Sequence, residues 1–77
     1  MTSLSLLKPG QRARITAIAG GGAIRQRLLD IGFLPATAIA IERVAPAGDP
    51  IWVRLQGSQI SLRRREADTV LVEACLD

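Results

Sequence analysis

The segment from Gly22 to Pro35 constrains the fold most, because it is patterned as a helix in a chain whose other segments resemble strands. Ile24, Leu28 and Ile31 recur four and three residues apart, a spacing that places them on one helix face. One short helix among short strands is typical of a small β fold with a helical insertion. We expect the apolar face of this helix to pack against the sheet.

The same segment carries the signals that end a helix. Gly32 follows the last apolar residue, at the position where a left-handed C-cap favours glycine. Phe33 can then fold back onto Leu28, and Pro35 prevents the helix from resuming. We therefore predict a helix that ends immediately before Gly32.

Two apolar runs predict a β-hairpin. Ile51–Gln56 and Gln59–Arg63 flank Gly57 and Ser58, which form a two-residue turn with glycine first. The expected cross-strand pairs are Gln56 with Gln59, Leu55 with Ile60, and Val53 with Leu62. This register places these aliphatic side chains on one buried face.

The other face of the hairpin carries Trp52, Arg54, Ser61 and Arg63. In the expected register Trp52 lies opposite Arg63, close enough for a cation–π contact. Because Trp and Arg are enriched at the hot spots of protein interfaces, this face is a candidate docking surface.

The remaining segments predict a mainly β architecture. Strands are expected over Arg12–Ala19, Ala38–Val44 and Thr69–Ala74, one helical turn over Arg64–Asp68, and loops at Lys8–Gln11 and Pro46–Pro50. About five short strands favour a small closed barrel, since closure removes exposed sheet edges.

Side-chain alternation orients two of these strands. Ala13, Ile15 and Ala17 are expected toward the core, with Arg12, Arg14 and Thr16 on the opposite face. In the next strand the alternation slips, which either a bulge near Arg43 or burial on both faces would explain.

The length and composition fit one cytoplasmic domain spanning residues 1–77. The chain has 77 residues, and 48% of them are hydrophobic, which suffices for an aliphatic core. Cys75 is the only cysteine, so no intrachain disulfide can form, and we expect a small, partly buried side chain there. No apolar run approaches the roughly 18 residues of a transmembrane helix, and the first residues lack a signal-peptide pattern.

The absence of histidine restricts the chemistry of the chain. Neither a Ser-His-Asp nor a Cys-His catalytic arrangement can be assembled without it. The seven acidic residues form no D-x-D-x-D or E-x-x-E cluster that would bind a metal tightly. We expect no enzymatic activity, no cofactor and no tight iron site.

Two short motifs each have more than one interpretation. Gly20–Gly22 precede the helix as a flexible connector or a weak anion site, although the G-K-[ST] of a phosphate loop is absent. Arg63–Arg65 form a solvated or paired surface turn, a protein-docking patch or a nucleic-acid contact. Nucleic acid is disfavoured because single-strand binders use aromatic platforms, and only Phe33 and Trp52 are aromatic.

Several segments occur in an order that points to one family. They are L-K-P-G-Q from Leu7, R-L-L-D-I-G-F-L-P from Arg27, R-V-A-P-A-G-D-P-I from Arg43, and I-S-L-R-R-R-E-A from Ile60. This combination resembles the FeoA family, small cytoplasmic proteins of bacterial ferrous iron transport. The resemblance covers about Leu6 to Val72. Where the family usually has glycine after its proline, this chain has Ala36.

The resemblance implies an SH3-like barrel with one inserted α-helix and a role in iron homeostasis and transition-metal handling at the family level. It also implies a partner, the ferrous iron permease FeoB with its cytoplasmic G-protein-like domain. We therefore expect an accessory or regulatory adaptor that docks there without entering the membrane, through Trp52, Arg54 and Arg63, Arg64 and Arg65. The alternative is an SH3-like module associated with nucleic acid or the ribosome, which the net charge of +3 favours.

Overall fold

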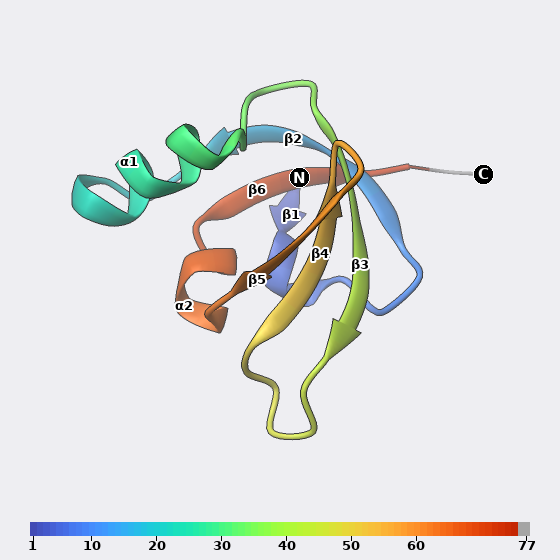
Figure 1. Cartoon of the computed structure of the whole chain (residues 1–77). Coiled ribbons are helices and arrows are strands. Elements are labelled where there is room, and N and C mark those ends of the chain that lie inside the picture. Colours follow the sequence, from blue (N-terminus) through green and yellow to red (C-terminus); the bar gives the residue numbers. More distant parts are fainter. Residues whose placement is uncertain (76–77) are drawn as a thin grey trace.

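The computed structural model describes residues 1–75 and is built around one antiparallel sheet with the strand order β1-β6-β2-β3-β4-β5. The elements are β1 Thr2–Ser3, a 3-10 helix η1 Leu4–Leu6, β2 Arg12–Ile18, α1 Gly22–Ile31, β3 Ala38–Val44, β4 Ile51–Leu55, β5 Ser58–Leu62, α2 Arg64–Ala67 and β6 Val70–Ala74. The sheet curls around a single core, with α1 at one end and the loop between β3 and β4 at the other (Figure 1). The mainly β fold with one inserted helix is confirmed, and β1 adds a sixth, two-residue strand.

The core is aliphatic apart from one aromatic ring, as the composition requires. Phe33 and Leu28 are fully buried, and so is Leu4 from the apolar N-terminal segment. The other buried side chains come from every strand except β1, and they include Ile15, Ile41, Ile51, Val53, Leu62, Val70 and Val72. The helix and the curled sheet therefore share one hydrophobic interior.

Helix α1 ends as predicted. Gly32 has a φ of 121°, and its N–H donates to the carbonyls of Leu28 and Leu29 at 3.2 and 3.1 Å. The N–H of Phe33 also donates to the Leu28 carbonyl at 3.0 Å, which completes a Schellman-type cap. The cap turns the chain so that the Phe33 ring enters the core beside the end of the helix.

The predicted apolar face of α1 is wrong at Ile31, which is 36% exposed. Leu29 packs against the core instead, together with Leu28 and, in part, Ile24. Successive residues of a helix are rotated by about 100°. The stripe that contacts the barrel lies between the directions of Leu28 and Leu29, and Ile31 is rotated away from it.

Strand β2 also departs from simple alternation. Its pairing with β6 shifts register between Ile15 and Ala17, so Ala17 is exposed and Ile18 is buried, the reverse of the prediction for Ala17. A bulge inserts one residue and thereby exchanges the faces that follow it. In β3 the bulge is the explanation that the structure shows for the slip in alternation, since the register with β4 shifts between Ile41 and Arg43.

The hairpin forms, but its turn is displaced by one residue. Gln56 and Gly57 are the turn residues, with φ angles of 50° and 82°, as a type I′ turn requires. The observed pairs are Leu55 with Ser58, Arg54 with Gln59, Val53 with Ile60, Trp52 with Ser61, and Ile51 with Leu62. Every partner has moved by two residues, so the buried face is as predicted although each predicted pair is wrong.

Cys75 is exposed, not partly buried as expected, because it follows the end of β6. Its backbone N–H donates to the Arg12 carbonyl at 2.9 Å. Within residues 1–75, no helix is both long and apolar enough to cross a membrane.

Candidate protein-docking surface

The outer face of β3 and β4 holds the one tryptophan against an arginine. The guanidinium of Arg43 lies 4.1 Å from the centroid of the Trp52 ring, a cation–π contact between cross-strand neighbours. The predicted contact of Trp52 with Arg63 is wrong, because the displaced turn pairs Trp52 with Ser61. Trp52 is half-buried and presents a rigid, amphipathic surface at this face.

Arg54 lies on the same outer face of β4 in a polar cluster. Its Nε donates to Oε2 of Glu42 at 2.6 Å, and one Nη donates to the Gly57 carbonyl at 2.9 Å. Gln59 donates from Nε2 to the other Glu42 oxygen at 2.9 Å. These donations from Arg54, and then from Gln59, lower the pKa of Glu42 below its ordinary value.

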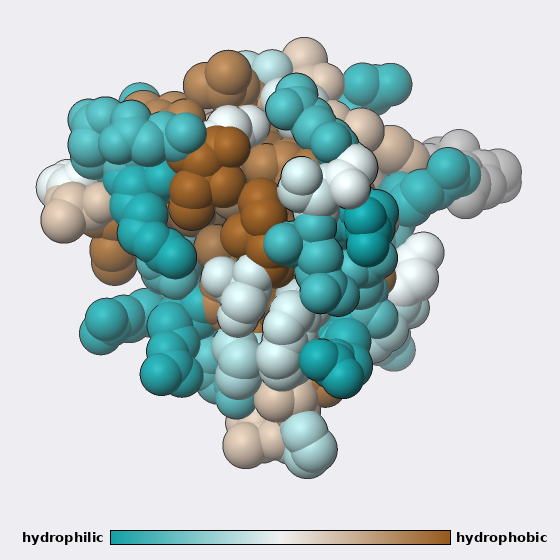
Figure 2. All heavy atoms as spheres, viewed as in Figure 1, coloured by the Kyte–Doolittle hydropathy of each residue, from teal (hydrophilic) through white to brown (hydrophobic). Residues whose placement is uncertain are grey.

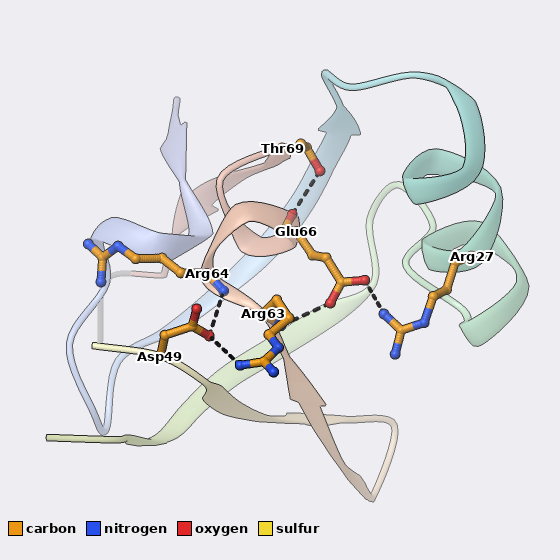
Figure 3. Close-up of polar contacts among 6 residues, drawn as sticks. All are labelled: Arg27, Asp49, Arg63, Arg64, Glu66 and Thr69. Atoms are coloured by element: carbon orange, nitrogen blue, oxygen red, sulfur yellow. Dashed lines mark hydrogen bonds and ion pairs between the residues drawn. The ribbon is translucent and has the colours of Figure 1, made fainter. Parts of the chain in front are cut away.

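The arginine run lies at the start of α2 and is partly paired. The backbone N–H of Arg64 donates to Asp49 at 3.1 Å, and the Arg63 guanidinium lies 3.8 Å from the same carboxylate oxygen (Figure 3). Arg64 also donates to the Gly48 carbonyl at 3.3 Å. Arg63 and Arg64 therefore hold the β3–β4 loop against α2, although their side chains, like that of Arg65, are exposed.

The acid of the R-R-R-E segment is structural. Glu66 is only 7% exposed, and one carboxylate oxygen accepts the N–H of Arg63 at 2.9 Å. The other oxygen pairs with Arg27 of α1, so Glu66 caps α2 and joins it to the inserted helix (Figure 3). The Glu66 side chain therefore points toward α1 and not toward the side chains of Arg64 or Arg65.

The predicted docking residues thus form two groups. Trp52 and Arg54 share the outer face of β4, whereas Arg63, Arg64 and Arg65 gather at α2. Each group presents positive charge, but the contacts of Arg63 and Arg64 go to the β3–β4 loop and not to β4.

Sequence reasoning missed an apolar surface beside α1. Hydrophobic side chains gather where α1 faces the β4–β5 hairpin, and hydrophilic side chains flank them (Figure 2). Leu34 is 49% exposed, and Ile31 is exposed at the end of the helix. Leu34 lies between the helix cap and Pro35, so its exposure could have been suspected from its place in a turn.

The glycine-rich segment and the acidic residues show no organised ligand site. An added Cβ would meet nothing at Gly21 or Gly22, and the Arg25 side chain that follows donates to the Ile18 carbonyl at 2.8 Å. Among the residues that the structure describes, no three His, Cys, Asp or Glu side chains are grouped as metal ligands.

Comparison with known proteins identifies the fold and its family. The FeoA domain family matches residues 2–74 of the chain. The chain belongs to the FeoA family. A FeoA-like protein from Clostridium acetobutylicum has 36% identity and a TM-score of 0.91, with 99% of this chain and 88% of that one covered. Iron(II) transport protein A from Clostridium thermocellum has 42% identity and a TM-score of 0.89, over 95% of this chain and 45% of that chain.

Two further relatives bear on what FeoA proteins do. A fusion of Fe(2+) transport protein A with the Fe(2+) transporter FeoB, from Porphyromonas gingivalis, is 37% identical over 70 residues, which are 91% of this chain but 8% of the fusion protein. FeoA from Stenotrophomonas maltophilia, solved as a zinc complex, is described as an SH3 domain protein and has 26% identity and a TM-score of 0.84, over 95% of this chain and 91% of that one. These likenesses support a role in ferrous iron transport and the SH3-like assignment of the fold.

Proposed function

We propose that this FeoA protein is an accessory of ferrous iron uptake that binds the cytoplasmic, G-protein-like domain of a FeoB permease. The observation that carries the proposal is the Porphyromonas gingivalis fusion, in which a relative of this chain and FeoB form one polypeptide. In a fusion protein, the covalent link keeps the two modules at a high effective concentration. When the two are separate proteins, a binding surface is needed to bring them together instead. The protein then acts as a single cytoplasmic domain, residues 1–77, that reaches the inner membrane through its partner and works by binding, not by catalysis.

The docking surface that we propose comprises Trp52, Arg54 and the turn of Arg63, Arg64 and Arg65. Trp52 and Arg54 are side by side on one strand face, which combines an aromatic ring with a guanidinium. Such residues dominate the binding energy of many protein interfaces. The apolar surface beside Ile31 and Leu34 is the alternative site on the same protein.

Binding to the purified FeoB cytoplasmic domain, measured in the GDP state and with a GTP analogue, tests this proposal. We expect Trp52→Ala and Arg54→Glu each to weaken binding by about 1–2 kcal/mol while thermal melts show an intact fold. Lys8→Glu is the matched charge reversal, because Lys8 is exposed in a turn outside the proposed surface. Undiminished binding of both variants would move the interface to the apolar surface, and no binding by the unaltered protein in either nucleotide state would refute the proposal.

An SH3-like nucleic-acid module is less well supported by the side chains available for stacking. Phe33 is fully buried, and Arg43 lies over the Trp52 ring. Stacking platforms for single strands are therefore limited to one ring that is already in contact with a cation. An RNA affinity that falls steeply with salt would favour this alternative.

A further inference from the structure

The last strand of the sheet, β5, has one edge that pairs with no further strand. β5 stands at the end of the strand order and pairs only with β4 among the residues that the structure describes (Figure 1). Gln59 and Ser61 are exposed on this strand, and a cavity of about 500 Å³ lies beside Ser61 and Arg63. The edge is therefore open to solvent from Gln59 to Ser61.

The hairpin turn determines which backbone groups face this edge. In a two-residue turn, the carbonyl of the residue before the turn accepts the N–H of the residue after it, which makes Leu55 and Ser58 a hydrogen-bonded pair. Hydrogen-bonded and non-hydrogen-bonded pairs alternate along an antiparallel ladder. Ile60 is thus bonded to β4, whereas the N–H and C=O groups of Gln59 and Ser61 point away from β4. These groups have the spacing that a further strand requires.

The edge lacks the features that usually prevent edge-to-edge association. Natural proteins block their sheet edges with lysines, prolines, bulges or very short strands. β5 contains no charged residue and no proline, and its pairing with β4 runs without a register shift. The opposite edge of the sheet, β1, is only two residues long. Of the two edges, β5 is therefore the one suited to pair with another strand.

We propose that the β5 edges of two copies of this chain pair antiparallel about a two-fold axis at Ile60. In this register Gln59 lies opposite Ser61 of the second copy, and Ser61 lies opposite Gln59 of the second copy. Each outward-pointing backbone group then meets a donor or an acceptor. The two Ile60 side chains meet at the axis, and in one copy Ile60 is half-buried against the core. FeoB plays no part in this pairing.

The charge pattern favours a second copy as the partner strand. Every residue of β5 is uncharged, so pairing the strand with itself places no like charges opposite each other. The ladder ends at α2, because Glu66 already accepts the Arg63 N–H. Arg63 lies opposite Gly57 of the second copy, so the two Arg63 residues are separated by about 20 Å along the strands.

The pairing leaves the proposed docking surface available. Antiparallel edges that join two sheets into one keep the outer faces of both copies on the same side, so Trp52 and Arg54 stay accessible in each copy. A short edge buries little area, and we therefore expect a weak dimer that forms at high protein concentration.

Amide hydrogen exchange of the unaltered chain, over an about hundredfold range of protein concentration, tests the pairing. We expect the Gln59 and Ser61 amides to exchange at least about tenfold more slowly at the highest concentration, because they are hydrogen-bonded only in the dimer. Ser58 and Ile60 are the reference, since β4 protects their amides in either state. Sedimentation equilibrium of the same samples measures the dimer. Exchange at Gln59 and Ser61 that does not depend on concentration would overturn the inference.

Two double variants test the register. Gln59→Lys with Ser61→Glu places opposite charges in both outer pairs of the dimer, whereas Gln59→Lys with Ser61→Lys places like charges there. Both variants share the change at Gln59, so any effect on its contact with Glu42 is the same in each. We expect the first variant to dimerise at least about tenfold more tightly than the second. Equal dimerisation of the two would exclude this register and overturn the inference.

The FeoB cytoplasmic domain distinguishes a second copy from a strand of another protein. Protection of Gln59 and Ser61 that appears only after this domain is added would overturn the inference and support FeoB as the partner at this edge. Self-association that Trp52→Ala leaves unchanged, while binding of the FeoB domain falls, supports both the inference and the proposed function. Self-association without any binding of the FeoB domain supports the inference and refutes the proposed function.

Discussion

Arg27 of α1 and Glu66 of α2 form an ion pair that joins two helices 39 residues apart in the sequence (Figure 3). Glu66 is nearly buried, while the Arg27 side chain is half exposed. The same carboxylate also accepts the Arg63 N–H, so one side chain fixes the start of α2 and the position of the inserted helix. The arginine turn at α2 is therefore oriented by a carboxylate that is almost fully buried.

Removal of the Glu66 carboxylate should destabilise the fold. We expect Glu66→Ala to lower the free energy of unfolding by about 2–4 kcal/mol, because it removes a buried charge-assisted hydrogen bond and an ion pair together. Glu66→Gln should cost less, since its amide oxygen can still accept the Arg63 N–H. Urea denaturation of the two variants measures the difference. A loss below about 0.5 kcal/mol for Glu66→Ala would show that the pair contributes little.

The inserted helix should depend on Leu28 far more than on Ile31. Leu28 is fully buried, so Leu28→Ala should lower the free energy of unfolding by about 2–5 kcal/mol. Ile31→Ala serves as the control on the same helix and should cost below about 1 kcal/mol, because Ile31 is exposed. Equal losses in chemical denaturation would contradict the orientation of α1.

Ala36 occupies a backbone conformation that glycine would adopt more easily. Its φ is 71°, and it follows Pro35 in a turn closed by the Thr37 N–H, which donates to the Leu34 carbonyl at 3.2 Å. Proline followed by a positive φ is typical of a type II turn. Ala36→Gly should raise the free energy of unfolding by about 0.5–1 kcal/mol, since it relieves strain that exceeds the entropic cost of glycine.

The control for this substitution is Ala17→Gly in β2, where the backbone is extended. There no backbone strain is relieved to offset the added flexibility of glycine in the unfolded chain. We therefore expect the free energy of unfolding to fall by about 0.5–1 kcal/mol. Opposite signs for the two substitutions in thermal or urea unfolding confirm the strain at Ala36, and the same sign would argue against it.

Glu42 should titrate below the ordinary glutamate range. Its folded-state pKa is lowered chiefly by the hydrogen bond from Arg54, so its ionised form favours the folded state at pH values above the unfolded pKa. This contribution is lost as the pH falls through the folded-state pKa. Carboxyl-carbon NMR titration of the Arg54→Gln variant should show the Glu42 pKa moving back up toward its ordinary value, and an unchanged pKa would exclude Arg54 as the main cause.

The sequence by itself determined the elements whose signals are local. Gly32 and Pro35 specified where α1 ends, because cap and proline geometry depend only on neighbouring residues. The alternation of Ile51, Val53 and Leu55 identified the buried face of β4, and the slip near Arg43 marked an irregularity that the structure shows to be a bulge. The ordered motifs also sufficed to indicate the FeoA family.

Tertiary structure alone decided which residues meet. A two-residue shift in hairpin register leaves the buried face unchanged, so the side-chain pattern could not distinguish Arg63 from Ser61 as the cross-strand partner of Trp52. The pattern also gave no reason to expect Arg43 as the cation over the Trp52 ring. The bulge in β2 exchanged Ala17 and Ile18 after a point that local propensity does not mark. The opposition of Ala38 to Arg14, and of Ala40 to Arg12 and Arg54, depends on register between segments far apart in the chain.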